Sequence, residues 1–527
     1  MRIVGWHFVV IACLLTSISW AERPRLVVLL CYDQMRADRL EKIRPWLGQR
    51  GFLRLLREGA VAERCLFNYA TTVTAAGHAT IATGCNPWRH GIVDNDFVLN
   101  GRPLYATDDT LLGEPSARLL LVPTLGDYMR QANPASKVWS FSQKDRGAIF
   151  LAGHNPTGVC WLQPHVGLGS SRYYPPCPPW IAAFNRAHSP ARYAGAVWNT
   201  SLRAPVDTVP WEGRFPGGER YFPHRLPADT SGNRFWQAFT LTPYSVEWLF
   251  QAAATCIRTE QLGSDTIPDL LCISVSTTDF VGHLFGHDSR EYAELLVACD
   301  RILAAFLDTL DQQIGRHHYV VVLTSDHGAA SIPELERTTY GLDAGRILSD
   351  TLFAWVSQWM ESVGMKGKGV IRYFFPPWIW LDSACLRESG WEFDKAAESL
   401  ARWLSQRRGI AYALPRRSIE EGVDTGIVGL IRRSYRSDRC GDIALYPEER
   451  WIFGLTPAQH GTPYEYDRWV PLVLFGGGIL PQRYRRLCSP ADIAPTIARL
   501  VGLLDLPCEG QPLSLSIAKS RQKTKHP

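Results

Sequence analysis

The stretch LVVLLCYD, residues 26–33, is an unbroken Leu- and Val-rich run that ends in an aspartate. Such a run is typical of a strand buried on both faces of a parallel sheet. Three later runs have the same character: Asp269–Val275, Tyr319–Thr324 and Val470–Phe475. Helical patterns lie between and after the runs, at Gly51–Gly59, Tyr244–Leu262, Glu291–Ile314 and Pro490–Val501. Strands that alternate with helices predict a layered α/β domain.

Aspartate and histidine residues follow the predicted strands, at the edge of the sheet where α/β proteins place their sites. Asp279 and His283 are four residues apart, so one helical turn puts both on the same face. Asp326 and His327 are adjacent and can reach one centre only if the chain curls, which Gly328 permits. Two zinc ions with open positions need two three-ligand sets, and a close pair of such ions acts in in-line displacement at phosphorus. The six candidate ligands are Asp33, Asp279, His283, Asp326, His327 and His460.

The bulk composition indicates a globular protein. The chain has 527 residues, of which 46% are hydrophobic and 20% charged, so it can bury a large core. The net charge of +5 is small for this length and gives no basic tract for a nucleic-acid binding module. We expect the partner to be a small anionic molecule instead.

The N-terminus has the pattern of an export signal. Arg2 precedes a mostly apolar run, and Ser19-Trp20-Ala21 resembles a small-x-small cleavage site. We therefore expect residues 1–21 to be a signal peptide cut after Ala21. No later segment reaches the roughly 18 uncharged apolar residues of a membrane span. The mature protein is expected to be periplasmic or secreted, without a membrane span once the signal is removed.

Residues 22–527 are expected to form one catalytic domain with two insertions. Residues 156–233 are rich in Pro, Trp, Tyr and Gly, and residues 338–448 contain their own helical patterns and an aromatic run. Both segments are expected to form a cap or rim over the core. Export would permit disulfides, and Cys160 with Cys177 is one conceivable pair among many. The sequence does not predict the oligomeric state.

Taken in order, these motifs resemble the alkaline phosphatase superfamily over nearly the whole mature chain. The family has a first-strand Asp, a nucleophile turn, D-x-x-x-H, a D-H pair and a late H-G-T, and each is present here. The resemblance implies an alkaline phosphatase-like three-layer fold, with a central, mostly parallel sheet flanked by helices. It also implies two Zn²⁺ per chain, although Asp-rich sites also accept Mn²⁺ or Co²⁺. One ion would be held by Asp279, His283 and His460. The other would be held by Asp33, Asp326 and His327, completed by the nucleophile oxygen.

The family's spacing selects the nucleophile among several threonines. It places the nucleophile nine residues before a Thr-Gly pair, and Thr83-Gly84 then selects Thr74 over Thr71, Thr72 and Thr80. Zinc coordination would activate this hydroxyl, which is a poor nucleophile at its free pKa. Cys85 lies in a C-x-P-x-R pattern like that of sulfatases, but it follows the Thr-Gly pair, and three histidines favour zinc over the calcium that sulfatases use.

Three residues that are not metal ligands indicate the class of ester. Asn95, and Lys144 with Arg146 two residues later, resemble residues of the PafA-like branch that contact phosphoryl oxygens. On an extended segment, Lys144 and Arg146 would aim at one side. A monoester dianion carries more charge than a diester and needs more positive donors around it. The related nucleotide pyrophosphatase/phosphodiesterase branch typically lacks the Lys/Arg pair.

The resulting prediction is an exported two-zinc phosphatase that hydrolyses small-molecule phosphate monoesters through a covalent phosphothreonine. A phosphodiesterase or nucleotide pyrophosphatase of the same superfamily is the first alternative, and a phosphonate hydrolase is another. A binding protein that keeps the fold without turnover belongs to a different class. The intact set of ligands argues against it.

Overall fold

A nine-stranded sheet forms the centre of the molecule in this computed structural model, which describes residues 23–202, 210–365, 369–503 and 505–518. The expected export signal lies outside the described residues. The strands follow the order β21 (Gln482–Tyr484), β2 (Ala60–Ala62), β20 (Val473–Gly476), β12 (Tyr319–Thr324), β1 (Leu26–Tyr32), β11 (Asp269–Val275), β6 (Val138–Ser142), β7 (Gly158–Gln163) and β8 (Gly167–Gly169). The five strands from β12 to β7 are parallel, and antiparallel pairs join β20 and β8 to them. The expected three-layer, mostly parallel α/β fold is confirmed.

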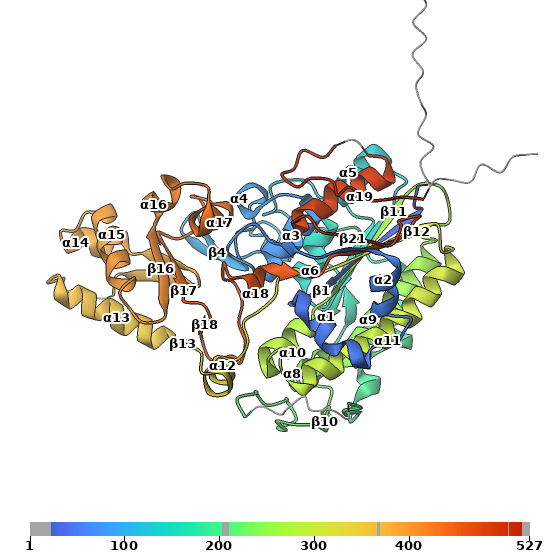
Figure 1. Cartoon of the computed structure of the whole chain (residues 1–527), viewed down its shortest axis with the longest axis horizontal. Coiled ribbons are helices and arrows are strands. Elements are labelled where there is room, and N and C mark those ends of the chain that lie inside the picture. Colours follow the sequence, from blue (N-terminus) through green and yellow to red (C-terminus); the bar gives the residue numbers. More distant parts are fainter. Residues whose placement is uncertain (1–22, 203–209, 366–368, 504, 519–527) are drawn as a thin grey trace, which may run out of the picture.

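The sheet is buried on both faces, as the apolar runs predict. Side chains alternate along β1, so that Leu26, Val28 and Leu30 enter one core cluster while Val27 and Leu29 enter the other. Each fully buried side chain of this size contributes about 1.5–3 kcal/mol to stability. One face is covered by α2 (Phe52–Glu58), α9 (Pro243–Thr259) and α11 (Arg290–Gln313). The other is covered by α3 (Thr74–Thr83), α5 (Leu125–Ala132), α6 (Asp145–Ala152) and α19 (Ile493–Val501), as Figure 1 shows.

The fourth predicted strand is interrupted. Pro471 separates β19 (Trp469–Val470), which pairs with β3 (Cys65–Leu66), from β20 in the central sheet. Because proline has no N–H to donate, the strand cannot continue its ladder through this position. The helix expected at Pro490–Val501 begins as a 3-10 turn, η3 (Pro490–Asp492), before α19.

The structure differs from the expectation of an insertion that begins at residue 156. β7 and β8 lie inside that segment, yet they extend the central sheet beyond β6. β7 begins at Gly158, where a Cβ would come within 2.3 Å of the Trp139 ring. The glycine leaves room for that ring. Because glycine has no apolar side chain, the segment lacks the apolar pattern by which a strand is predicted. The rest of the segment includes α7 (Pro179–Ala187) and the short pair β9 (Val197–Trp198) and β10 (His224–Arg225).

A second, smaller unit lies beside the main sheet, at the left of Figure 1. Its antiparallel sheet has the order β14 (Ile371–Phe375), β15 (Trp378–Leu381), β17 (Ile443–Pro447) and β16 (Ile410–Pro415). The helices α13 (Ser349–Ser362) and α15 (Phe393–Leu404) pack on it around a separate apolar core. The chain enters through β13 (Gly345–Ile347) and returns through β18 (Trp451–Phe453), and these two strands pair in parallel. The unit therefore has two connections to the main domain that lie side by side.

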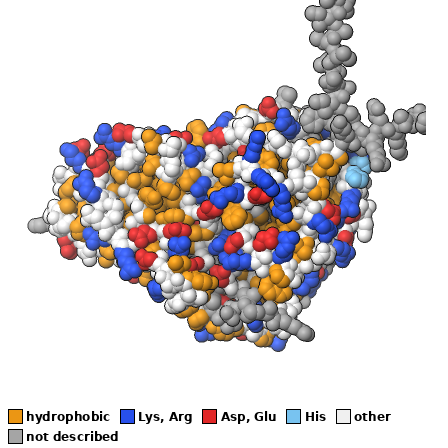
Figure 2. All heavy atoms as spheres, viewed as in Figure 1, with side chains coloured by type: hydrophobic (Ala, Val, Ile, Leu, Met, Phe, Trp, Pro, Cys, Tyr) orange, Lys and Arg blue, Asp and Glu red, His pale blue; other side chains and the backbone are white. Residues whose placement is uncertain are grey.

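The surface carries charges of both signs. Figure 2 shows basic and acidic side chains interspersed over this face of the molecule rather than gathered into one basic field. Among the described residues, no helix is both long and apolar enough to cross a membrane.

Candidate active site

The carboxyl ends of four neighbouring parallel strands supply most of the site. Asp33 follows β1, and Asp326 with His327 follows β12. β11 leads into α10 (Thr277–Phe285), which carries Asp279 and His283 one turn apart. β6 leads to Lys144 and α6. The remaining parts come from Thr74, the first residue of α3, and from His460 in the loop after β18.

Asp279, His283 and His460 form one cluster, in which a ligand atom from each lies within 4.8 Å of the others. Oδ1 of Asp279 lies 3.2 Å from Nε2 of His283 and 3.8 Å from Nε2 of His460. The structure therefore brings together the first expected ligand set.

Asp33, Asp326 and His327 form a second cluster of the same size, entirely buried. Nε2 of His327 lies 3.5 Å from Oδ1 of Asp33 and 3.5 Å from Oδ2 of Asp326. The chain does curl after β12, and a Cβ at Gly328 would come within 2.1 Å of the Tyr466 carbonyl, so only glycine fits there. The rings of His327 and His460 stack with centroids 3.7 Å apart, which places the two clusters side by side.

The orientation of all three imidazoles is set by backbone carbonyls. Nδ1 lies 2.9 Å from Ala458 O in His283, 2.9 Å from Gly328 O in His327 and 2.8 Å from Thr72 O in His460. A carbonyl only accepts, so each Nδ1 carries the hydrogen and each Nε2 presents its lone pair to the carboxylates. Burial, the first cause in each case, lowers the pKa of His327 and of His460 and keeps both rings neutral. Neutral imidazole is the form that binds a metal.

Three carboxylates are buried close together and need positive charge. Burial and the neighbouring Asp326 carboxylate raise the pKa of Asp33 well above its usual range. Burial also opposes ionisation of Asp279, but the Lys144 ammonium and His283 lower its pKa well below that range. Oδ1 of Asp33 has no hydrogen-bond donor among the described residues. A buried carboxylate oxygen without a donor is costly, and a cation would satisfy it.

Lys144 connects the two clusters. Its Nζ lies 2.8 Å from Oδ2 of Asp33 and 2.5 Å from Oδ2 of Asp279, and its side chain is 4% exposed. Lys144 is the N-cap of α6, and Arg146 lies in the first turn of that helix. The expectation that both residues lie on one extended segment is therefore wrong. A helix begins there instead because β6 ends at Ser142, whose hydroxyl accepts from the Lys144 N–H at 3.1 Å.

Thr74 is the threonine of its turn that faces the clusters. Its Oγ1 lies 3.4 Å from Nε2 of His327. The competing hydroxyls are occupied elsewhere: Thr71 pairs with Tyr446, Thr72 donates to the Thr462 carbonyl, and Thr80 lies against Tyr69 and His90. Cys85 lies beyond the opposite end of α3, about 15 Å along the helix axis from Thr74.

Asn95 lies beside the nucleophile turn, and Arg146 lies close enough to Asp33 and Asp279 to interact with their charges. The Asn95 Oδ1 accepts a hydrogen bond of 3.0 Å from the N–H of Ala75, so its Nδ2 remains to donate to another group. The Arg146 guanidinium donates to the Tyr105 hydroxyl and lies over that ring, 5.6 Å from its centroid. Burial lowers the pKa of Arg146, but Tyr105 and Asp33 raise it. The net pKa is higher than usual, so the guanidinium stays charged.

Gln34 is a site residue that the sequence reading missed. Its N–H donates to Oδ1 of Asp326 at 3.0 Å and its Nε2 to Oδ1 of Asp279 at 2.8 Å. Nε2 of His287 in turn donates to Oε1 of Gln34 at 2.8 Å. The backbone of Gln34 has φ of 64°, which is strained for a residue with a side chain and is common at functional sites. The one sequence signal for Gln34 is its position directly after the candidate ligand Asp33.

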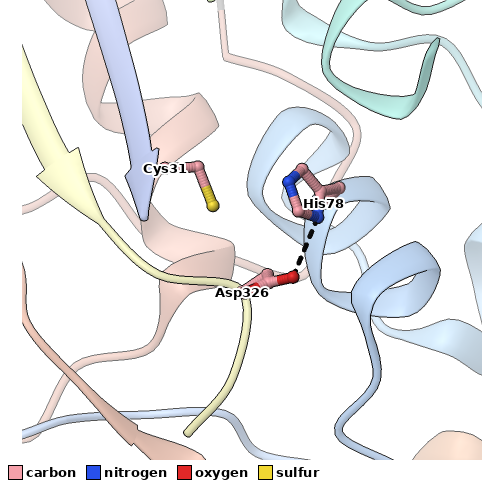
Figure 3. A group of neighbouring side chains, drawn as sticks. All are labelled: Cys31, His78 and Asp326. Carbon is pink, nitrogen blue, oxygen red and sulfur yellow. Dashed lines mark ion pairs between the residues drawn. The ribbon is translucent and has the colours of Figure 1, made fainter. Parts of the chain in front are cut away.

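His78 was also missed, although it lies one helical turn after Thr74. Its Nδ1 lies 2.8 Å from the Thr74 carbonyl and 3.1 Å from Oδ2 of Asp326, as Figure 3 shows for the latter pair. The Thr74 carbonyl only accepts, so Nδ1 carries the hydrogen and donates it there, and Nε2 then accepts from the Ser274 hydroxyl at 2.8 Å. His78 thus links the nucleophile's backbone to a candidate metal ligand.

Cys31, His78 and Asp326 also lie close enough to suggest a third metal group. Burial, with Asp326 and Asp33 nearby, raises the pKa of the Cys31 thiol well above its usual range. The His78 Nδ1 that faces Asp326 carries a hydrogen, which it donates to the Thr74 carbonyl, and its Nε2 is bonded to the Ser274 hydroxyl, so His78 has no free lone pair for a separate metal ion. Asp326 belongs to the cluster with Asp33 and His327.

A cavity of about 410 Å³ opens next to the clusters. His283, His460 and Asn95 line its inner side. Its opposite wall comes from the second unit and from β18, through Phe375, Pro376, Pro377, Ile452 and Phe453. The second unit therefore forms part of the entrance to the site.

Comparison with known proteins identifies relatives of this arrangement. The family model described as type I phosphodiesterase / nucleotide pyrophosphatase matches residues 27–465. Alkaline phosphatase PhoV of Synechococcus elongatus is 31% identical over 502 residues, covering 91% of this chain and 90% of the relative. Alkaline phosphatase PafA of Elizabethkingia meningoseptica is 31% identical over 507 residues, covering 91% and 92%. The crystal structure of PafA superposes with a TM-score of 0.87 at 30% identity, covering 94% of this chain and 99% of that one. The structure of a PafA variant has also been solved, in which one Thr is replaced by Ser and an Asn, a Lys and an Arg are each replaced by Ala. It superposes with a TM-score of 0.85 at 29% identity, covering 94% of this chain and 99% of the variant.

Proposed function

We propose that this chain, which belongs to the type I phosphodiesterase / nucleotide pyrophosphatase family, is a phosphatase of the alkaline phosphatase type that hydrolyses phosphate monoesters. The expected kinship with PafA-like alkaline phosphatases is confirmed by the two relatives and by the PafA fold. The proposal about the substrate rests on one observation: Asn95, Lys144 and Arg146 gather beside Thr74 and the two carboxylate–imidazole clusters.

The solved PafA variant supports this assignment of residues. It changes a Thr, an Asn, a Lys and an Arg, with the same sequence separation from Thr to Asn and from Lys to Arg as Thr74, Asn95, Lys144 and Arg146 have here. These four residue types, with the Thr–Asn and Lys–Arg intervals kept, are the set that we assign to the nucleophile and the phosphoryl contacts.

The two clusters fit a pair of divalent ions. We propose that Asp279, His283 and His460 hold one ion, and that Asp33, Asp326, His327 and the Thr74 oxygen hold the other. Three Nε2 lone pairs and the unpaired Asp33 oxygen favour Zn²⁺, with Mn²⁺ or Co²⁺ as alternatives. When bound, such ions supply the positive charge that lowers the pKa of a hydroxyl or a water and neutralises a leaving oxygen.

The chain's own residues perform the positioning. The Thr74 Oγ attacks phosphorus in line, the bond from phosphorus to the ester oxygen breaks, and a phosphothreonine forms. Water then attacks that phosphorus, which releases phosphate and restores the hydroxyl. Asn95 Nδ2, Lys144 and Arg146 donate to the oxygens of the transferring group, where charge spreads in the transition state. The N-terminus of α3 adds a favourable dipole at the same place.

The ratio of kcat/KM for an aryl phosphomonoester to that for an aryl phosphodiester tests the proposal. Arg146→Ala is expected to lower the monoester value by about a hundredfold or more and the diester value much less, because the monoester presents more charge to the guanidinium. Arg50→Ala, at a 72% exposed side chain, is the control and should change neither value. Equal losses on both substrates would favour the phosphodiesterase.

We also propose that residues 1–21 direct export and are removed after Ala21, which would place the enzyme in the periplasm or outside the cell. Sequencing the N-terminus of the exported protein tests this. A mature chain that retains Met1 would contradict it.

A further inference from the structure

Two pairs of cysteines, distant in sequence, have their thiols in contact in the fold. Burial and the nearby Cys488 thiol raise the pKa of Cys65, and the contact between Cys160 and Cys177 raises the pKa of Cys160 and lowers that of Cys177. The described residues contain twelve cysteines, and most of the others are buried singly in apolar surroundings.

The backbone around Cys65 and Cys488 has the geometry of a cross-link. The two residues form a parallel β-bridge, in which Leu66 N donates to Cys488 O at 2.9 Å and Cys488 N donates to Arg64 O at 3.1 Å. Bridged residues lie about 4.8 Å apart, which is inside the range of roughly 4.4–6.8 Å between the Cα atoms of a disulfide. Both side chains are almost fully buried, at 0% and 4% exposed, and both belong to one core cluster.

Cys160 and Cys177 join a sheet strand to the loop before α7. Cys160 lies in β7 and is 1% exposed, whereas Cys177 is exposed. The contact with Cys160 lowers the pKa of the Cys177 thiol to about 7, although partial burial opposes the shift. An exposed thiol that ionises near neutral pH is the one that starts thiol–disulfide exchange, and a buried neighbour can complete it.

We propose that the mature protein contains two disulfide bonds, Cys65–Cys488 and Cys160–Cys177, and that the first fastens the C-terminal segment beside the helix that carries Thr74. In each pair, two thiols give up two electrons and two protons and form one S–S bond. The oxidant is a disulfide such as glutathione disulfide, which takes up both and becomes two thiols.

The Cys65–Cys488 bond would act on the frame of the active site. Cys488 directly precedes Ser489, which caps η3, and η3 with α19 packs against α3. The bond would close a loop of more than four hundred residues, and long loops gain most from such a constraint on the unfolded chain. It would therefore hold the support of α3 in place without touching substrate.

The test is a map of the cysteines in the full mature chain, produced by export into the periplasm or treated with glutathione disulfide. The protein is unfolded without reductant, alkylated and digested. We expect eight of the twelve cysteines to be alkylated and two cross-linked peptides that join Cys65 to Cys488 and Cys160 to Cys177. Alkylation of all twelve, or cross-links between other cysteines, would overturn the proposal.

Single variants provide a second measurement. Cys65→Ser should make Cys488 alkylatable, whereas Cys272→Ser, at a buried cysteine whose sulfur donates to the Leu151 carbonyl, should release no other cysteine. If Cys65→Ser does not fold, the cysteine map of the unmodified chain still tests whether the two disulfide bonds are present. Reduction with a phosphine should lower the Tm of the unmodified protein. An unchanged Tm, with the cross-links shown to be broken, would overturn the role of Cys65–Cys488 as a fastening.

Discussion

The side-chain amide of Gln34 donates to Oδ1 of Asp279 at 2.8 Å. The N–H of the same residue donates to Asp326 at 3.0 Å, so one residue fixes a carboxylate in each candidate metal cluster. Such outer partners orient the ligands and commonly account for a 10–100-fold difference in metal affinity. The strained backbone at this position is stabilised by these contacts.

Gln34→Ala is predicted to weaken metal binding by about 10–100-fold, because Asp279 and Asp326 would lose their common support. Titration of the metal-free protein with Zn²⁺, followed by calorimetry, measures the dissociation constant. Asn100→Ala is the matched control, since Asn100 has a similar φ of 51° but is exposed and far from the clusters in sequence. Equal loss of affinity in both variants would show that backbone strain alone explains the effect.

Thr74→Ala is predicted to lower kcat for a phosphomonoester by about a thousandfold or more, because it removes the attacking oxygen. Thr74→Ser should retain part of the activity, and mass spectrometry of its acid-quenched reaction should detect a phosphorylated serine. Thr71→Ala is the control within the same turn, where the hydroxyl pairs with Tyr446. Activity of Thr74→Ala close to that of the unmodified enzyme would exclude Thr74 as the nucleophile.

His460→Ala is predicted to reduce the metal content from about two ions to about one per chain, because it takes away one of three ligands of a single cluster. Elemental mass spectrometry of the dialysed protein measures the content. His90→Ala is a buried control whose ring contacts Thr80 instead of a carboxylate. Removal of all metal by a chelator should also lower the Tm of the unmodified enzyme, since binding to the folded state stabilises it. A content of two ions in His460→Ala would remove this residue from the ligand set.

Asp288→Asn is predicted to destabilise the protein at pH 7 by about 1–3 kcal/mol, because Asp288 accepts a 2.6 Å hydrogen bond from the buried Arg39. Burial opposes ionisation of Asp288, but Arg39 lowers its pKa far below the usual value of 3.8. The folded pKa is lower than the unfolded one, so this contribution is complete above pH 4 and is lost as the pH falls below it. Urea unfolding at several pH values should show the gap between variant and unmodified protein narrowing in acid. Asp308→Asn, in an exposed pair with Arg50, should show almost no gap at any pH.

The sequence was sufficient to predict what depends on local pattern. The strands β1, β11 and β12 are continuous apolar runs, and the ligands that follow them lie at the chain positions where such strands end. β7 and β8 were not predicted, because short glycine-containing strands at the edge of a sheet have little periodicity. The contacts of Gln34 and Lys144 could not be predicted either. They depend on how β1, β6, β11 and β12 are aligned across the sheet, which no local pattern encodes.

The route of the chain back from the second unit has a consequence for changing the specificity of this enzyme. β18 contributes Ile452 and Phe453 to the wall of the cavity, and the same segment soon reaches Gln459 and His460. An exchange of the second unit between relatives would therefore also move a ligand of the candidate metal centre unless the β13–β18 pair were kept. New substrate ranges should arise more readily by substitution within the β14–β15 turn than by replacement of the whole unit.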